Sequence, residues 1–267
     1  MLFQFYQPSK SLQPFIEGYL EADVRNHTKK ASHTLFPNGF SGIFFNFGNK
    51  GKLIVKEAYD TPPVSIFGQI DCHFTIEHWP GFYSLGVLLK PAILSKIFRL
   101  NMAELTNKAF HGELFRNDFK FLHEQLESAP SVKQKINLIE AFFLQLLKSI
   151  DHQNTITDQA LCIIHQEETI SIERLAKRLQ VSQRYLEMNF KKAIGLSPKT
   201  YTMIQRFKRI ESLITKNQTV NLASVDFTDT YYDQNHFIKD FKRFTGHTPT
   251  DYLTLDFDMG RSYMIGS

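Results

Sequence analysis

The 267-residue sequence has only two cysteines, one tryptophan and no long apolar run. Cys72 and Cys162 have no CxxC spacing, so neither a disulfide framework nor a zinc site is indicated, and both are expected to be reduced, buried thiols. No stretch of about 18 apolar residues occurs, and the N-terminus lacks the basic and apolar segments of a signal peptide. We therefore expect a soluble, cytoplasmic protein without a membrane partner.

Sequence motifs of common enzyme classes are missing as well. No GxSxG nucleophile elbow, phosphate-binding glycine loop or HExxH motif occurs. The sequence therefore predicts no catalytic residues, no cofactor and no metal, and the chain is not expected to be an enzyme. The alternative interpretation is a cupin-like enzyme or a ligand-binding protein whose main activity lies in the first half of the chain.

Positive charge is concentrated in the last third of the chain. Residues 1–151 carry 16 Lys or Arg against 14 Asp or Glu, whereas residues 172–244 carry 14 against 7. A local excess of this kind is typical of a region that binds a polyanion such as nucleic acid.

The first half shows the pattern of a small β-barrel or sandwich. Between Leu35 and Leu89, short runs rich in Ile, Val, Phe and Thr are separated by turn signals such as Pro37-Asn38-Gly39 and Pro80-Gly81. The runs predict strands at 42–47, 52–58, 65–69, 72–78 and 84–89.

After Pro91 the apolar spacing becomes helical, and later helices are predicted at 117–127 and 132–150. The last of these has an apolar stripe that could pack within its own domain or against a second subunit. The stripe consists of Ile136, Ile139, Phe143, Leu146 and Leu147. The polar segment 151–155 interrupts this periodicity, and we place a domain boundary there. The predicted fold class is α+β with two domains: a mostly β domain with trailing helices at 1–151 and an all-helical domain at 155–255, followed by a tail at 256–267.

A helix-turn-helix pattern begins at Ser171. This residue is placed to cap a first helix, and the small Ala176 on the buried face of that helix lets a second helix cross closely. Ser182 is placed to cap the second helix and Gly195 to end it. The second helix is predicted to bury Leu186, Asn189, Phe190 and Ala193.

The opposite face of this second helix carries polar and long side chains. They are Gln183, Arg184, Glu187, Met188 and Lys191. Amide and guanidinium groups near the start of a helix are the chemistry that reads base edges in a DNA major groove. A solvated face on an ordinary helical hairpin has the same pattern, so this unit alone leaves both interpretations open.

A second, looser copy of the pattern lies at 222–244, with its turn at Tyr231-Tyr232-Asp233. Its second helix is predicted to bury Phe237, Ile238, Phe241 and Phe244. The free side of that helix offers Gln234, Asn235, His236, Lys239, Lys242 and Arg243 as DNA contacts. A helix from Ser197-Pro198 to Lys216 joins the copies and spans about 28 Å, close to the ~34 Å of one turn of B-DNA.

Residues 155–255 resemble the DNA-binding domain of the arabinose-operon regulator (AraC/XylS) family. The likeness is carried by Gly195-Leu-Ser-Pro-Lys-Thr-Tyr201, by Arg206-Phe-Lys-Arg209 and by the run from Tyr231 to Pro249. The resemblance implies a bacterial transcription regulator that binds double-stranded DNA through two helix-turn-helix units joined by a long helix. By position, it implies a first reader of Gln183, Arg184, Glu187, Met188 and Lys191 and a second of Gln234, Asn235, His236 and Lys239. Arg184 and Gln234 are the best candidates for base contacts, because each can form a bidentate pair, with guanine and adenine respectively.

Four positions depart from the family pattern. Asp226, Asp229 and Thr230 stand where alanine, an apolar residue and glycine are usual, and Met188 stands where arginine is frequent. Two carboxylates there would disfavour close helix crossing and repel phosphates. We therefore expect the second unit to bind DNA more weakly or to dock at a changed angle, and the overall affinity to be modest.

The first half resembles, more weakly, the sensor domain of some members of this family, in Leu35 to Gly39, Phe67 to Gln69 and Leu85 to Pro91. Such domains bind a small effector or dimerise the protein, so an effector, a second copy of the chain and RNA polymerase are further possible partners. Several aromatic residues could line an effector pocket or form the core of a barrel. They are Phe36, Phe40, Phe45, Phe74, Trp79, Phe82 and Tyr83.

Three histidines, His33, His73 and His78, raise the question of a metal. His73 and His78 are separated by an odd number of positions, so on one strand they would point to opposite faces. This spacing argues against a shared metal ion.

Overall fold

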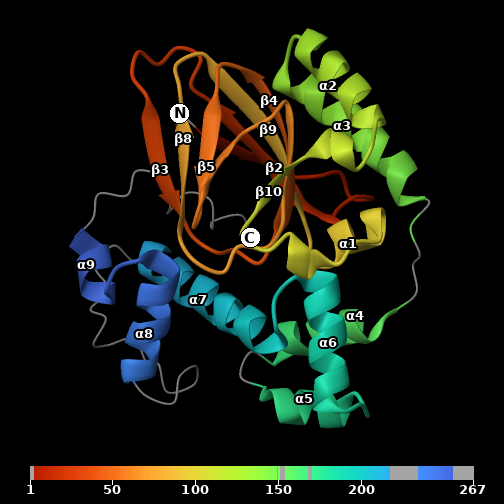
Figure 1. Cartoon of the computed structure of the whole chain (residues 1–267), viewed down its shortest axis with the longest axis vertical. Coiled ribbons are helices and arrows are strands. Elements are labelled where there is room, and N and C mark those ends of the chain that lie inside the picture. Colours follow the sequence, from red (N-terminus) through yellow and green to blue (C-terminus); the bar gives the residue numbers. More distant parts are fainter. Residues whose placement is uncertain (1–2, 149, 151–153, 168–169, 217–233, 255–267) are drawn as a thin grey trace.

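The computed structural model describes residues 3–148, 150, 154–167, 170–216 and 234–254. Two β-sheets face each other in the first part of the chain, and helices make up the second part (Figure 1). The predicted α+β fold with a β-rich first part and a helical second part is confirmed.

All strand pairs in the two sheets are antiparallel. The first sheet contains, in spatial order, β1 (Phe3–Tyr6), β2 (Ile16–Asp23), β9 (Phe82–Leu89), β4 (Ser41–Gly48), β7 (Val64–Phe67) and β10 (Ala109–His111). The second sheet contains β3 (Ala31–Leu35), β8 (Phe74–His78), β5 (Gly51–Ile54) and β6 (Ala58–Asp60). Within the described residues the sheets are not joined into a closed barrel, so the architecture is a sandwich.

The strand predicted at 52–58 was wrong as a single element. The chain turns back after β5, where the backbone N–H of Val55 donates to the carbonyl of Glu57 at 3.0 Å, and returns as β6. Strand β2 carries two glutamates and a glycine, and it was not predicted even though it lies between β1 and β9.

The first hydrophobic core lies between the first sheet and two helices, α2 (Asp118–Ser128) and α3 (Val132–Leu147). The apolar stripe of α3 packs into this core, where Ile139 and Phe143 are fully buried. The stripe therefore packs within the first part of the chain. Shorter elements complete this part: α1 (Ile93–Phe98) and the 3-10 helices η1 (Met102–Glu104) and η2 (Gly112–Leu114).

The second hydrophobic core belongs mainly to the later helices. These are α4 (Ile156–Gln166), α5 (Ile172–Arg178), α6 (Gln183–Ile194), α7 (Pro198–Lys216), α8 (Gln234–Thr245) and α9 (Pro249–Thr254). Two residues of the first part, Phe36 and Ala92, are buried in this core as well. The Phe36 ring lies 6.2 Å from that of Phe207 and 5.6 Å from that of Tyr252, between ring centroids. The two parts of the chain therefore pack directly against each other, while the predicted boundary at 151–155 falls partly outside the described residues.

Both cysteines are free thiols, but the prediction that they are buried was wrong. Cys72 is half-buried and Cys162 is exposed, because the latter lies on the outer face of α4. In the described ranges, no helix combines the length and the apolar character needed to cross a bilayer.

Candidate nucleic-acid interface

Helices α5 and α6 form the first helix-turn-helix unit with the caps that the sequence predicts. The hydroxyl of Ser171 accepts a hydrogen bond from the backbone N–H of Arg174, and that of Ser182 from the N–H of Tyr185, both at 3.2 Å. Each bond satisfies one of the backbone donors that a helix start leaves open. Gly195 ends α6 in the left-handed conformation, with φ of 96°.

The buried face of α6 differs slightly from the prediction. Leu186, Phe190 and Ile194 are buried at intervals of four residues, whereas Asn189 and Ala193 are only half-buried. The Asn189 amide donates to the carbonyl of Tyr185 at 2.8 Å, so this polar side chain bonds to its own helix at the edge of the core. The inner position that we assigned to Ala193 is taken by Ile194.

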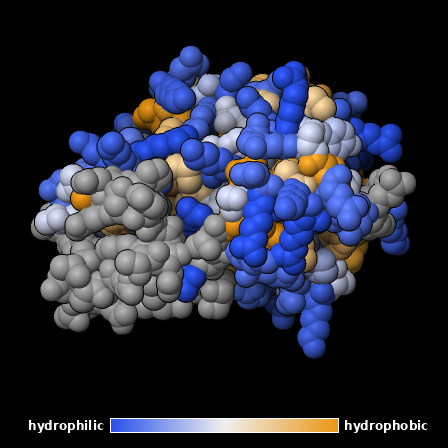
Figure 2. All heavy atoms as spheres, turned by 90° about the horizontal axis from the view of Figure 1, so that it is seen from below, coloured by the Kyte–Doolittle hydropathy of each residue, from blue (hydrophilic) through white to orange (hydrophobic). Residues whose placement is uncertain are grey.

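The opposite face of α6 is open to solvent over its whole length. All five side chains of the predicted first reader are exposed: Gln183, Arg184, Glu187, Met188 and Lys191. The Met188 side chain is 60% exposed, which is a large fraction for an apolar residue. In Figure 2 the molecule is seen from the side of α5 and α6, and hydrophilic residues cover most of the described surface there.

Two neighbours on this face differ in their hydrogen bonding. The Gln183 amide donates to the Glu187 carboxylate at 2.8 Å, one helical turn away, so the carboxylate fixes the orientation of the amide. Among the described residues the Arg184 guanidinium has neither a hydrogen bond nor an ion pair. Its five N–H donors are therefore available to a guanine edge or a phosphate.

Tyr185 is an exposed residue of this helix that the sequence analysis missed. Its side chain is 48% exposed and belongs to the first turn of α6, beside Arg184. Its phenol belongs to neither of the two groups, amide and guanidinium, on which the prediction for the first turn rests. The helical periodicity could have identified it as exposed, because Tyr185 does not belong to the buried series of Leu186, Phe190 and Ile194.

Exposed cationic side chains lie on both helices of the first unit. The first turn of α6 contains no acidic residue, and Arg174 and Lys177 on α5 are exposed. Arg178 is exposed too, but it is paired with Glu167. Cations near a helix N-terminus favour the approach of a phosphate group.

Helix α8 is the second helix of the predicted second unit. Phe237, Phe241 and Phe244 are buried as predicted, and Ile238 is half-buried. Gln234, Asn235 and His236 form its first turn, but their side chains lie outside the described residues. The preceding segment with Asp226, Asp229 and Thr230 also lies outside them.

The remaining predicted contacts of α8 divide into two groups. Lys239 and Lys242 are exposed. Arg243 is exposed too, but its guanidinium lies 3.1 Å from a carboxylate oxygen of Asp71 in the first part of the chain. Helix α7 runs between α6 and α8 over 19 residues and buries Tyr201 and Phe207 along its length (Figure 1).

Comparisons with known proteins agree with this geometry. Residues 175–254 match a family described as a helix-turn-helix domain, and residues 4–111 match a domain of unknown function, DUF6597. The Msm operon regulatory protein of Streptococcus mutans is 30% identical over 231 residues, which cover 79% of this chain and 82% of that protein. The chain belongs to the AraC/XylS family of transcription regulators.

Other relatives of this AraC-family regulator match over shorter stretches or at lower identity. The F1 operon positive regulatory protein of Yersinia pestis is 29% identical over 94 residues, which span 34% of this chain and 30% of that protein. Among solved structures, ToxT of Vibrio cholerae has a TM-score of 0.49 and 13% identity, covering 88% of this chain and 97% of that one. The comparisons point to transcription regulators, and DNA is the partner that the family implies.

The regulator also encloses a cavity of about 350 Å³ between its two sheets. Of the aromatic residues that we considered for a pocket, Phe36, Phe40, Phe74 and Phe82 line this cavity. Phe45 and Tyr83 are buried in the first core instead. Trp79 holds the Lys30 ammonium 4.7 Å from its ring centroid.

One end of the cavity is closed by α7, which belongs to the DNA-binding part of the chain. Lys208, Arg209 and Ser212 of α7 are among its lining residues. The Lys208 ammonium lies 4.2 Å from the centroid of the Phe40 ring, and burial lowers the pKa of this lysine. Among the described residues Lys208 has no direct ion pair, although the charges of Glu17, which lines the same cavity, and of Glu211 act to raise its pKa.

The other end of the cavity is polar. His78 lies at the start of β9, where it stacks on Phe82. Phe40 lies near the other end of this strand, because its neighbour Ser41 pairs with Leu89. Burial, and secondarily His33, lowers the pKa of His78 to about 4, so its imidazole is neutral at pH 7. In the described part of the chain, neither His78 Nδ1 nor Thr61 Oγ1 has a hydrogen-bond partner. Within that part, no group of three or more His, Cys, Asp or Glu residues is arranged to hold a metal.

Proposed function

We propose that this regulator reads two neighbouring major-groove segments of a promoter with the exposed face of α6 and the first half of α8. The observation that carries the proposal is the solvent-open face of α6, on which the Arg184 guanidinium has no partner within the described residues. Arg184 would make the base contact and Lys191 would hold a phosphate. Helix α7 would set the distance between the readers, since its 19 residues span about 28 Å.

The direct test is selection of bound duplexes from a random DNA pool, followed by footprinting on the selected sequence. We expect two protected segments on one side of the duplex, about 10 base pairs apart from centre to centre. A single protected segment of four or five base pairs would contradict reading by two helices. Binding with equal affinity to the selected and random duplexes would contradict sequence-specific binding altogether.

We also propose that the cavity holds an effector: an elongated, mostly apolar molecule with an anionic group at the Lys208 end. An anion there would form the direct ion pair that the half-buried ammonium of Lys208 does not make among the described residues, in addition to the longer-range attraction of Glu17 and Glu211. The apolar body would lie between Phe40 and Phe82. His78 Nδ1 and Thr61 Oγ1 would meet a polar group at the far end.

Thermal unfolding with decanoate and with decanol, its uncharged counterpart, tests this effector class. We expect decanoate to raise the unfolding temperature of the wild type and the Lys208→Met variant to lose most of that increase. Lys199→Met, which removes an exposed lysine at the start of the same helix, is the matched control and should respond like the wild type. Equal stabilisation by decanol and decanoate would contradict the anionic group.

The place of action follows from the DNA partner. We propose that the protein acts at promoters in the cytoplasm. Contacts with RNA polymerase and a homodimer remain predictions of the family resemblance.

A further inference from the structure

Both reading helices end against the same two loops of the β-rich part. At the end of α6, the Thr106 hydroxyl donates to the carbonyl of Gly195 at 2.8 Å. At the end of α8, Gly246 packs on His73, and a Cβ there would lie 3.1 Å from the imidazole. Arg243, in the last turn of α8, is paired with Asp71 at 3.1 Å.

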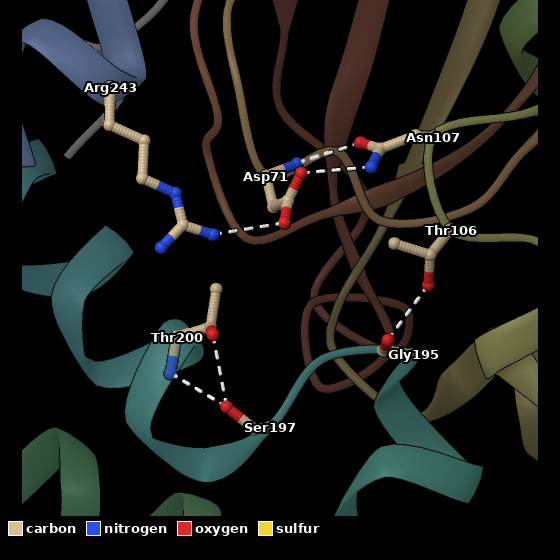
Figure 3. A network of polar contacts seen from close by, with 7 residues as sticks. All are labelled: Asp71, Thr106, Asn107, Gly195, Ser197, Thr200 and Arg243. Atoms are coloured by element: carbon tan, nitrogen blue, oxygen red, sulfur yellow. Dashed lines mark hydrogen bonds and ion pairs between the residues drawn. The ribbon is translucent and has the colours of Figure 1, made fainter. Parts of the chain in front are cut away.

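The Thr106–Gly195 hydrogen bond and the Asp71–Arg243 ion pair are made by one hydrogen-bonded group of loop residues, which we call the support (Figure 3). The Asn107 side chain accepts from the backbone N–H of Asp71 at 3.0 Å and donates to Oδ1 of its carboxylate at 2.8 Å. This pair of bonds leaves Oδ2 of Asp71 for Arg243. The backbone N–H of Asn107 also donates to the carbonyl of Gln69 at 2.9 Å, which ties the two loops together. Consecutive residues, Thr106 and Asn107, therefore hold the ends of α6 and α8.

The support lies at the C-terminal ends of both helices. The predicted base contacts of α6 lie at its other end, where Gln183 and Arg184 are exposed. Twelve residues of helix separate the two ends of α6 by about 18 Å. The loops thus hold each helix at its C-terminal end, and the first half of α6 stays open to solvent.

We infer that Thr106, Asn107 and Asp71 are positioning residues for DNA binding: they fix the relative placement of α6 and α8, and so the spacing of the two groove segments that the protein recognises. The inference rests on the proposed reading by two helices. The alternative is that Asp71 has no positioning role and that its carboxylate only competes with DNA phosphate for Arg243.

The two roles of Asp71 predict opposite changes in DNA affinity when its carboxylate is removed. Removing a carboxylate beside a DNA-binding helix strengthens DNA binding if charge alone matters, because it frees Arg243 and removes a repulsion from phosphate. If Asp71 positions α8, its removal weakens binding to the selected operator although the protein becomes more positive. Asn107→Gly tests the same contact without any change of charge. Glycine is chosen because Asn107 has φ of 59°, a conformation that alanine would adopt only with strain.

The experiment compares full-length wild type with Asp71→Ala, Asn107→Gly and Thr106→Val on the operator selected by the wild type. It also uses operators with one or two base pairs inserted between the two protected segments. We expect each variant to bind the original operator roughly threefold to tenfold more weakly, the range for a partly exposed ion pair or hydrogen bond. We also expect each to discriminate less against the lengthened operators. Asp60→Ala, which removes an exposed carboxylate on β6 that has no hydrogen bond or ion pair with α6 or α8 among the described residues, is the matched control and should bind like the wild type.

Three results would overturn the inference. They are tighter binding by Asp71→Ala, unchanged affinity in Asn107→Gly and Thr106→Val, and variants that keep the full spacing preference of the wild type. Thermal unfolding of each variant shows whether it is folded. A folded Asn107→Gly or Thr106→Val variant should bind random DNA as the wild type does, and Asp71→Ala should bind it at least as tightly, because non-specific binding depends on charge. Failure of the proposed function is distinguishable, because the wild type itself would then select no operator with two segments.

Discussion

The guanidinium of Arg243 lies 3.1 Å from the carboxylate of Asp71, although the two residues are 172 positions apart in the chain (Figure 3). Lys239, Lys242 and Arg243 are all exposed on α8, but of the three only Arg243 has an ion pair among the described residues. In this arrangement the Arg243 charge is already partly neutralised, so Lys239 and Lys242 are better placed to attract phosphate. Direct DNA contact by Arg243 stays a prediction of the sequence, because only Nη2 of its guanidinium contacts Asp71 and the side chain is 44% exposed.

Arg184→Ala should weaken binding to the selected operator by about 1–3 kcal/mol, the range for a bidentate contact with guanine. Binding to random DNA should change little, because a base contact contributes to specific affinity only. Titration of both duplexes at one salt concentration measures the difference. An equal loss on the two duplexes would reassign Arg184 to a phosphate contact.

Lys191→Ala should weaken binding on every sequence and make it less dependent on salt. One phosphate contact contributes about 0.9 to the slope of log affinity against log salt concentration, so the slope should decrease by about that amount. The measurement is a series of titrations between about 50 and 200 mM salt. Lys133→Ala, which removes an exposed lysine at the start of α3, is the control for net charge. If both variants change the slope equally, Lys191 has no special contact with DNA.

The first helix-turn-helix unit was predictable because its signals are local. Ser171, Ser182 and Gly195 act on backbone groups within a few residues of themselves, so their roles follow from spacing alone. The exposed face of α6 follows from the same periodicity, with Tyr185 as the exception. The helices α2, α3 and α7 also begin within one residue of their predicted starts.

The contacts between the two parts of the chain could not be predicted. The pairing of Asp71 with Arg243 and the burial of Phe36 among helices join residues that no local pattern connects. The unpredicted strand β2 has a similar cause, because its neighbours β1 and β9 determine its place and its own alternation is weak. For the same reason the cavity was open to two interpretations in the sequence, and only the packing of the sheets distinguishes Phe40 from Phe45.

Gly195→Ala should lower the free energy of unfolding by about 1–3 kcal/mol, because alanine is strained at φ of 96°. A Cβ at this position would also lie 2.8 Å from the carbonyl oxygen of Met102, a backbone atom that cannot easily move. Gly246→Ala is the matched variant, since its φ is 79° but its Cβ would meet only the His73 side chain. Urea unfolding should therefore show a larger loss for Gly195→Ala. Equal losses would mean that backbone strain alone accounts for the effect.

His78 should make the folded protein less stable in mild acid. Its pKa is about 4 in the folded state and about 6.5 when unfolded, so below pH 6.5 the unfolded chain binds a proton that the folded chain does not. Stability from this residue is complete above about pH 7 and is lost as the pH falls toward 4, by about 2 kcal/mol at pH 5.

The measurement is urea unfolding of the wild type and of His78→Phe at pH 7 and pH 5. Phenylalanine keeps the stacking on Phe82, where the ring centroids are 4.5 Å apart, but cannot bind a proton. The variant should therefore lose about 2 kcal/mol less than the wild type between the two pH values. Parallel losses in the two proteins would show that His78 is protonated in the folded state at pH 5, and hence that the polar end of the cavity admits water or a counter-ion.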